Sequence, residues 1–275
     1  MKMSSKKKRK RIETILVGMG LSDKTVSSYG RVYRALSERF KSGISETSIV
    51  EFLGDVKEST SESMYYLYYY ALKKLAKIAK VPFDVKPPEK PEPRHRPVVS
   101  MEQLQTMIDW AKENGSKAAK FYLALSSVFG FRRVELCSLT EENFVNNYIV
   151  VKPKKRGRTR QHRIPPEIED MVYGFRPSGM NEATMSRFFR SLAKKAGVSL
   201  PKRAGWHSIR RLLVTSLFES GVDPMLISKF MGWSLVRPAV AFISPMVEIY
   251  TRIESDRVDE EIYAQHPILP MWREK

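Results

Sequence analysis

Three short segments beyond residue 129 bring together arginine, histidine and lysine. Residues 130–135 read Gly-Phe-Arg-Arg-Val-Glu and place two arginines directly after an apolar stretch. His207 and Arg210 are three residues apart, so in a helix they would lie on one face. Residues 152–163 hold seven basic side chains and no acid. Arginine grips phosphate oxygens with paired hydrogen bonds, and histidine or lysine can move a proton. The combination predicts a site for phosphoryl transfer.

The net charge indicates a polyanionic partner. The 275 residues carry a formal charge of +18, and residues 2–11 and 152–163 supply 14 of it, since each run holds seven basic side chains and no acid. Charge packed so densely repels itself unless a polyanion neutralises it, and nucleic acid is the common polyanion inside cells. We expect the following residues to contact DNA: Lys6, Lys7, Lys8, Arg9, Lys10, Arg11, Lys154, Arg156, Arg158 and Arg160.

The composition argues against several other classes of protein. Cys137 is the single cysteine, which excludes an internal disulfide and a cysteine-built zinc site. The four histidines are far apart, and no paired carboxylates with metal-ligand spacing lie near the arginines, so we expect no metal and no cofactor. No run approaches the ~18 consecutive apolar residues of a membrane span, and no apolar core follows the basic N-terminus. We therefore expect a cytoplasmic, nucleoid-associated protein.

Helical periodicity dominates the first part of the chain. After the capping candidate Ser22, apolar residues recur at steps of three and four through Phe40, and Ser45 and Ser61 open two further helices. We expect residues 1–11 to form a disordered basic arm and residues 12–81 to form a helical DNA-binding domain. Residues 82–97 contain six prolines, which favour an extended linker.

The second domain, residues 98–275, is expected to position the basic groups. The predicted helices span residues 100–114, 116–129, 181–196, 206–220 and 223–231, with one more near 245–253. A strand at 148–151 and the segment ending at 163–165 predict a hairpin with Gly157 near its turn. The fold class is therefore mainly α with a small β-hairpin or sheet (α+β).

The order of these segments resembles that of the tyrosine recombinase (lambda-integrase-like) family. Residues 129–136 (Phe-Gly-Phe-Arg-Arg-Val-Glu-Leu) resemble the first arginine box, and residues 207–211 (His-Ser-Ile-Arg-Arg) resemble the histidine–arginine box. Residues 231–234 (Met-Gly-Trp-Ser) are similar to a Leu-Gly-His-Ser segment, with tryptophan replacing histidine. Residues 248–251 (Glu-Ile-Tyr-Thr) resemble the segment of the tyrosine nucleophile. Residues 21–29 resemble the start of the family's core-binding domain.

This resemblance implies a site-specific DNA recombinase, an integrase of an archaeal or other mobile element. It would cut and rejoin DNA through a 3′-phosphotyrosyl intermediate without metal or ATP. Its partners would be a double-stranded attachment site and three further copies, as a homotetramer on two duplexes. The implied catalytic residues are Arg132, Lys155, His207, Arg210, Trp233 and Tyr250, with Glu135 in support.

Several points stay open at the level of sequence. Trp233 and Tyr250 are 17 residues apart, roughly twice the family's usual interval, and Tyr263 is the next tyrosine downstream. Lys155 is favoured as the proton donor because it fits a Lys-x-Gly turn, with Lys154 second and Lys152 third. A type IB topoisomerase-like relaxing enzyme and a non-catalytic DNA-binding protein on the same fold are the alternative functions.

Overall fold

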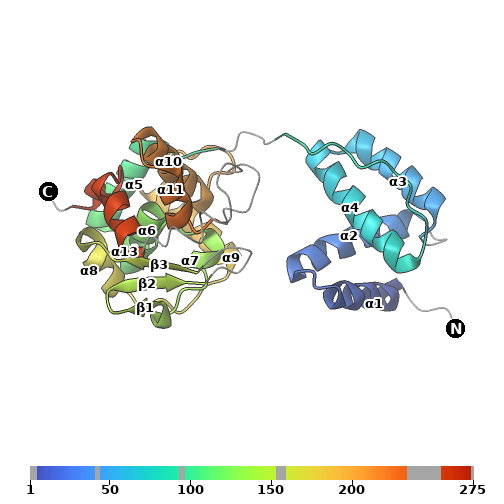
Figure 1. The fold of residues 1–275 in the computed structure, drawn as a ribbon, viewed down its shortest axis with the longest axis horizontal. Helices are drawn as coiled ribbons and strands as arrows, with labels where there is room; N and C mark the ends of the chain where they lie inside the picture. The colour runs from blue at the N-terminus through green and yellow to red at the C-terminus, as the bar shows by residue number, and fades with distance from the viewer. Residues whose placement is uncertain (1–4, 41–43, 93–96, 153–158, 234–254, 274–275) are drawn as a thin grey trace. The chain divides into compact units, whose positions relative to one another are not determined.

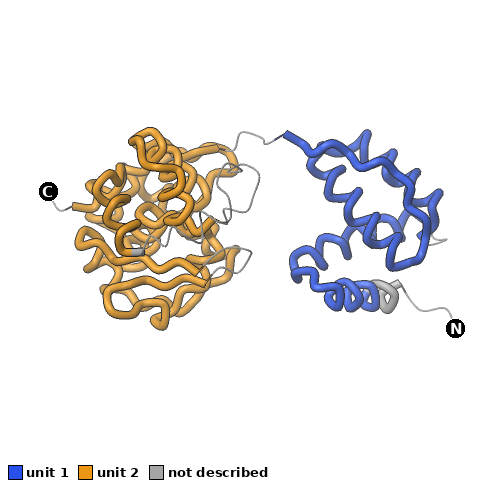
Figure 2. Tube along the Cα trace, in the orientation of Figure 1, with its two compact units in different colours: residues 1–94 blue, residues 95–275 orange. Residues whose placement is uncertain are grey.

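Two units make up the chain, and each has a hydrophobic core of its own. The computed structural model describes residues 5–40, 44–92, 97–152, 159–233 and 255–273. Unit 1 comprises Met1–Arg94 and unit 2 comprises His95–Lys275 (Figure 2). The division falls inside the proline-rich segment 82–97.

Unit 1 is a bundle of helices (Figure 1). Its helices are α1 (Ser5–Gly18), α2 (Asp23–Arg39), α3 (Glu46–Ser59) and α4 (Glu62–Ala79). The Oγ atom of Ser22 accepts a hydrogen bond from the Thr25 amide and so caps α2, while Ser45 and Ser48 form a capping box that starts α3. Ser61 precedes α4 without a side-chain cap. Buried residues that form the core include Val32, Leu36, Ile49, Leu53, Leu72 and Leu75.

Helix α1 corrects the expectation of a disordered arm over residues 1–11, because the helix already begins at Ser5. The apolar residues that follow the basic run explain this: Leu16 is fully buried, and Ile12 packs on the core of unit 1. Helix α1 also approaches α2 closely at Gly30, where an added Cβ would stand 2.7 Å from a side-chain oxygen of Glu13. Packing of the C-terminal half of α1 on the bundle therefore stabilises a helix that includes the basic residues.

The described ends of the proline-rich segment are each held by one unit. Val85 packs on the core of unit 1, and its carbonyl accepts a hydrogen bond of 2.7 Å from the Tyr69 hydroxyl. At the other end, the carbonyl of Pro97 accepts a hydrogen bond of 3.0 Å from Oγ of Ser208. The part that can act as a linker is therefore shorter than residues 82–97.

Unit 2 is mainly helical and contains a small sheet, as the sequence predicts (Figure 1). Its helices are α5 (Met101–Asn114), α6 (Lys117–Phe129), α7 (Arg133–Leu136), α8 (Pro166–Tyr173), α9 (Glu182–Lys195), α10 (Trp206–Glu219), α11 (Pro224–Phe230) and α13 (Ser255–Ala264), with 3-10 turns η1 (Glu141–Asn143) and η3 (Leu269–Trp272). The strands β1 (Phe144–Val145), β2 (Tyr148–Val151) and β3 (Arg160–Arg163) form an antiparallel sheet in that order. The predicted hairpin corresponds to β2 and β3, whereas β1 and α8 were not predicted.

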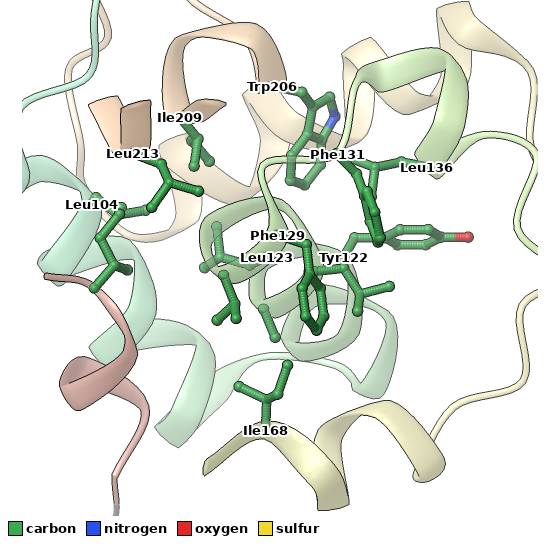
Figure 3. Close-up of a cluster of buried hydrophobic side chains, with 14 of the residues drawn as sticks. Leu104, Tyr122, Leu123, Phe129, Phe131, Leu136, Ile168, Trp206, Ile209 and Leu213 are labelled. Carbon is green, nitrogen blue, oxygen red and sulfur yellow. The ribbon is translucent and has the colours of Figure 1, made fainter. Parts of the chain in front are cut away.

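Helix α6 lies at the centre of unit 2. Every residue from Phe121 to Phe129 is buried, so this helix is apolar on all sides, as expected of a helix inside a core. Figure 3 shows Leu104 of α5, Ile168 of α8 and Leu213 of α10 gathered around it. Helix α10, which carries His207 and Arg210, is therefore packed against α6.

Gly130 ends α6 and starts the arginine segment. Its φ of +59° lies in the left-handed region, which glycine adopts without steric cost. An added Cβ at Gly130 would stand 2.8 Å from Cε of Met231 and 3.2 Å from Cδ2 of Leu213. Both the backbone conformation and the lack of space require glycine, and the arginine segment is thereby held against α10 and the end of α11.

Helix α13 packs on β3. Nδ1 of buried His162 lies 2.9 Å from Oδ1 of Asp259, and the amide of Arg163 donates to Oδ2 of the same carboxylate at 2.7 Å. The helix predicted near residues 245–253 lies outside the described residues. None of the described helices is long and apolar enough to cross a membrane.

Candidate active site

Arg132 stands at the start of α7 and is held by a buried carboxylate. Oε1 of Glu135 accepts a hydrogen bond from Nη1 of Arg132, and Oε2 accepts one from the Arg132 amide, both at 2.7 Å. Glu135 is only 2% exposed, whereas the side chain of Arg132 is 29% exposed. The guanidinium group is therefore fixed from inside while part of it remains accessible to a ligand.

The charge of Glu135 is stabilised by its neighbours. Burial opposes ionisation of the carboxyl, but Arg160 and the hydrogen bonds from Arg132 outweigh this effect, so the pKa of Glu135 is lowered. The carboxylate stays ionised at neutral pH and can hold both arginines. The supporting role predicted for Glu135 requires such an ionised carboxylate.

Arg160 does not occupy the position expected of a DNA contact. Arg160 is only 4% exposed. Its Nη2 pairs with Oε2 of Glu135, and its Nη1 lies 3.3 Å from the carbonyl oxygen of Phe129. The reason is strand register: Arg160 lies directly opposite Val151 of β2, which is buried, so both side chains lie on the inner face of the sheet. The prediction that Arg160 contacts DNA is corrected accordingly.

Arg210, on the first turns of α10, is held by backbone carbonyls. Its Nη1 donates to the carbonyl of Gly130 at 2.5 Å and its Nη2 donates to the carbonyl of Met231 at 3.0 Å. Burial lowers the pKa of Arg210, and the positive charges of Arg160 and Arg132 lower it further. The group thus carries a buried positive charge that neutral carbonyls only partly compensate, and an anionic ligand would relieve this cost.

His207 lies one turn before Arg210 and is exposed. Partial desolvation of its imidazole lowers its pKa to about 4, and the arginines around it contribute, among them Arg210, Arg211 and Arg132. At neutral pH His207 is therefore uncharged, so a ring nitrogen is free to accept a proton. The sequence-predicted pair of His207 and Arg210 is brought together with Arg132.

Trp233 follows α11 and is half-buried against the core of unit 2. The guanidinium carbon of Arg210 lies 5.8 Å from the centre of its ring, within the range of a cation–π contact. The residue before it, Gly232, has a φ of +63° and leaves no room for a side chain. Trp233 is thus placed beside Arg210.

Arg133 is a residue whose role the sequence did not reveal. Its Nη1 donates to Oγ of Ser186 at 2.8 Å, and its Nη2 pairs with Glu182, both on α9. A second arginine next to Arg132 could have been taken for another phosphate contact, but it joins α7 to α9. Only the tertiary structure could assign it, because the partners are 49 and 53 residues away.

Several predicted residues cannot be placed in this site. Lys154, Lys155, Arg156, Arg158 and Tyr250 lie outside the described residues. Lys6, Lys7, Lys8 and Arg9 belong to α1, in unit 1, where Lys10 and Arg11 are exposed. Lys152, the third candidate for the catalytic lysine, is exposed at the end of β2.

Tyr263, the alternative nucleophile, is committed to another contact. Its hydroxyl donates a hydrogen bond of 2.6 Å to the carbonyl of Arg163. Burial and the carboxylate of Asp259 raise the pKa of this phenol well above its usual value. Tyr263 is therefore poorly suited to act as a nucleophile in this arrangement.

Together, Arg132, Arg160 and Arg210 contribute three guanidinium groups against the one carboxylate of Glu135, a formal charge of +2. Within the described part of the chain, no group of three His, Cys, Asp or Glu side chains is arranged to hold a metal ion. The arrangement can bind a phosphodiester, stabilise negative charge that develops on it, and accept a proton beside it.

Part of unit 2 matches a known protein family. Residues 171–252 match the phage integrase family; the match includes His207, Arg210, Trp233 and Tyr250 but not Arg132. No curated protein matches the chain.

Solved structures of integrases share the fold. A structure of the lambda integrase (residues 75–356) bound to DNA is 16% identical, with a TM-score of 0.64 over 92% of this chain and 98% of that chain. A lambda integrase tetramer bound to a Holliday junction is 17% identical, with a TM-score of 0.65 over 89% and 78% of the two chains. The Tn1549 transposon integrase in complex with transposon right end DNA is 17% identical, with a TM-score of 0.54 over 88% and 99%.

Proposed function

We propose that the chain is a tyrosine recombinase, a site-specific DNA integrase of a mobile element. The observation that carries the proposal is the clustering of Arg132 and Arg210 near an uncharged His207, with Trp233 against Arg210. The family match supports the proposal, since it spans His207, Arg210, Trp233 and the segment of Tyr250. The solved integrases of the same fold are consistent with DNA as the substrate.

The proposed reaction exchanges one phosphoester for another. The hydroxyl oxygen of Tyr250 attacks the phosphorus of a scissile phosphodiester, and the bond from phosphorus to the 5′ oxygen breaks. The DNA 3′ end is left on the tyrosine. His207 takes the tyrosine proton, and Lys155 gives a proton to the departing 5′ oxygen. Because the covalent link keeps the bond energy, rejoining needs neither ATP nor a metal.

The arginines would stabilise the charge that develops during this exchange. The phosphate gains negative charge as the tyrosine attacks. Arg210 offers a positive charge that carbonyls only partly compensate, and Arg132 is paired with Glu135 but remains partly accessible to the phosphate. Trp233 would pack against the same phosphate. Since the pKa of His207 is about 4, its imidazole is in the proton-accepting form over the whole neutral range.

The wider assembly is proposed on the same basis. The basic residues of α1 and of the run before β3 would contact phosphates and supply affinity that does not depend on base sequence. The lambda integrase forms a tetramer on a Holliday junction. We infer a homotetramer on two duplexes for this chain as well.

A plasmid assay separates the proposal from its alternatives. A binding site is first selected from a random pool of duplexes and is then placed in two supercoiled plasmids. A recombinase fuses the two circles, and the Tyr250→Phe variant does not. Relaxation without fusion would indicate a topoisomerase-like enzyme, and binding with neither reaction would indicate a non-catalytic DNA-binding protein.

A further inference from the structure

We propose that Arg160 is a positioning residue for Arg132, which it orients through the carboxylate of Glu135. This inference rests on the proposed function, because it assigns a role within the same site. It replaces the expectation that Arg160 contacts DNA, and it starts from the burial of an arginine among aromatic rings.

The surroundings of Arg160 fix its guanidinium group on several sides. Its central carbon lies 4.7 Å from the centre of the Phe131 ring, and Nη1 lies 3.3 Å from the carbonyl oxygen of Phe129. The other terminal nitrogen, Nη2, pairs with Oε2 of Glu135. A planar fork with several donors meets these demands at once, which the single ammonium of lysine cannot do.

The same carboxylate passes the constraint on to Arg132. Oε2 of Glu135 is shared between Arg160 and the Arg132 amide, while Oε1 holds Nη1 of Arg132. Without Arg160, one oxygen of a carboxylate that is 2% exposed would lose its charged partner. With Arg132 as its one remaining charged partner, the buried carboxylate can rotate towards another donor, because a poorly compensated charge in the interior is costly. The orientation of Arg132 would then be lost without any change to Arg132 itself.

A second contact connects Arg160 to the segment that precedes Trp233. A Cβ at Gly232 would stand 2.5 Å from Cδ and 2.7 Å from Cγ of Arg160. Glycine at this position therefore leaves the space that the Arg160 side chain crosses. Strand β3, helix α7 and the end of α11 all meet at this one buried arginine.

The experiment compares charged and neutral scissile phosphates. A methylphosphonate replaces one charged non-bridging oxygen by a methyl group, so it needs less charge stabilisation from arginine. Duplexes with a selected binding site carry either the ordinary phosphate or each methylphosphonate diastereomer at the cleavage position. The rate of covalent adduct formation is measured for the full-length wild type, Arg160→Met, Arg132→Met and the control Gln161→Met, an exposed position on the same strand.

We expect Arg160→Met to slow adduct formation on ordinary DNA by about 10²-fold and to react within about threefold of the wild type on one methylphosphonate, as loss of one charge-stabilising donor predicts. The diastereomer that rescues Arg160→Met should be the one that rescues Arg132→Met. Gln161→Met should behave as the wild type on every duplex.

An equal slowing of Arg160→Met on all duplexes would overturn the inference, because it would indicate general damage to the fold. A rate equal to that of the wild type on ordinary DNA would overturn it as well. If Arg160→Met does not fold, judged by thermal unfolding, Arg160→Gln is measured instead, since its amide can hydrogen-bond in the same place without a charge beside Glu135, and the same rescue pattern is required. Absence of an adduct in the wild type would contradict the proposed function, which separates that failure from failure of this inference.

Discussion

The two candidate catalytic arginines are held in opposite ways. Arg132 is bound by a carboxylate that is itself shared with Arg160. Arg210 is bound by two backbone carbonyls, those of Gly130 and Met231. The start of α7 therefore contains a charge-compensated arginine, and the start of α10 contains an arginine whose charge is left over.

This difference indicates how such a site can be both charged and ordered. Carbonyls that belong to the backbone cannot be displaced without moving α6 or α11, so the position of Arg210 is set by the fold. The position of Arg132 depends on the side chain of Glu135, which is shared with the distant Arg160, and one substitution can release it. Arg210 supplies most of the uncompensated positive charge. The position of Arg132, in contrast, can be changed by substituting a side chain that holds it.

Loss of the proposed proton donor should slow cleavage most, and it can be distinguished from loss of either arginine. Lys155→Ala should slow cleavage of ordinary DNA by ~10²–10⁴-fold, since the 5′ oxygen then leaves as an alkoxide. On a duplex with sulfur as the bridging 5′ atom, the leaving thiolate has a pKa near ~8.5 and needs no donor, so the rate should return close to that of the wild type. Single-turnover adduct formation provides the measurement.

Arg132→Ala and Arg210→Ala serve as matched controls and should remain slow on the sulfur-bridged duplex, because charge stabilisation is still missing. Rescue of Lys154→Ala without rescue of Lys155→Ala would shift the assignment by one residue. Rescue of an arginine variant would mean that this arginine takes part in proton donation, contrary to the separate roles proposed for the arginines and Lys155.

The next effect tests the difference between the arginines directly. We expect Arg210→Lys to slow adduct formation by about 10³-fold and Arg132→Lys by about 10²-fold, the range for loss of one charge-stabilising donor. Lysine can still pair with the carboxylate of Glu135, but it cannot span two carbonyls and a phosphate. Equal rates for the two variants would show that the mode of anchoring does not matter.

Much of this site could be predicted from the sequence. His207 and Arg210 have helical spacing, and Gly130 marks the end of an apolar helix, so their local structure follows from short-range rules. The caps at Ser22 and Ser45 could be predicted for the same reason. These features depend on residues within a few positions of one another.

The remaining features depend on contacts between distant residues. Arg160 belongs to a run of basic residues, and composition alone suggested a surface contact. The alternation of buried Arg160 and His162 opposite buried Val151 and Ile149 was the available signal, but it requires the strand register. In the same way, the basic start of α1 could not be predicted as helical without knowing that Leu16 is buried against the bundle.

A smaller effect probes the space that Arg160 needs. Gly232→Ala and Gly197→Ala both place alanine at a positive φ, +63° and +71°, but only Gly232 faces Arg160, while Gly197 has nothing within 4 Å. Both changes carry the same backbone strain, so their difference isolates the contact. We expect Gly232→Ala to lower the free energy of unfolding by about 1–3 kcal/mol more than Gly197→Ala, as overpacking does. Chemical denaturation measures both, and equal losses would refute the steric role of Arg160.

The smallest effect concerns His207. Its pKa of about 4 should be seen in an NMR titration of labelled histidine, and Arg211→Gln should raise it by removing a neighbouring positive charge. Arg187→Gln, an exposed change on α9, should leave it unaltered. Because the folded protein binds this proton less readily than the unfolded chain, with its ordinary value of ~6.5, the contribution of His207 to stability falls as the pH falls from 6.5 towards 4. A titration midpoint near 6.5 would contradict the electrostatic description of the site.

The proposed function requires that Tyr250 attacks a phosphate whose charge is stabilised by arginines and not by a metal ion. A selected duplex with a nick next to the cleavage position traps the covalent adduct, because the short 5′ fragment diffuses away. The reaction is run in EDTA, and the DNA-linked peptide is identified by mass spectrometry. We expect an adduct in EDTA, linked through Tyr250 and absent in Tyr250→Phe, as the proposed function requires. A link through Tyr263, or cleavage that EDTA abolishes and magnesium restores, would contradict it.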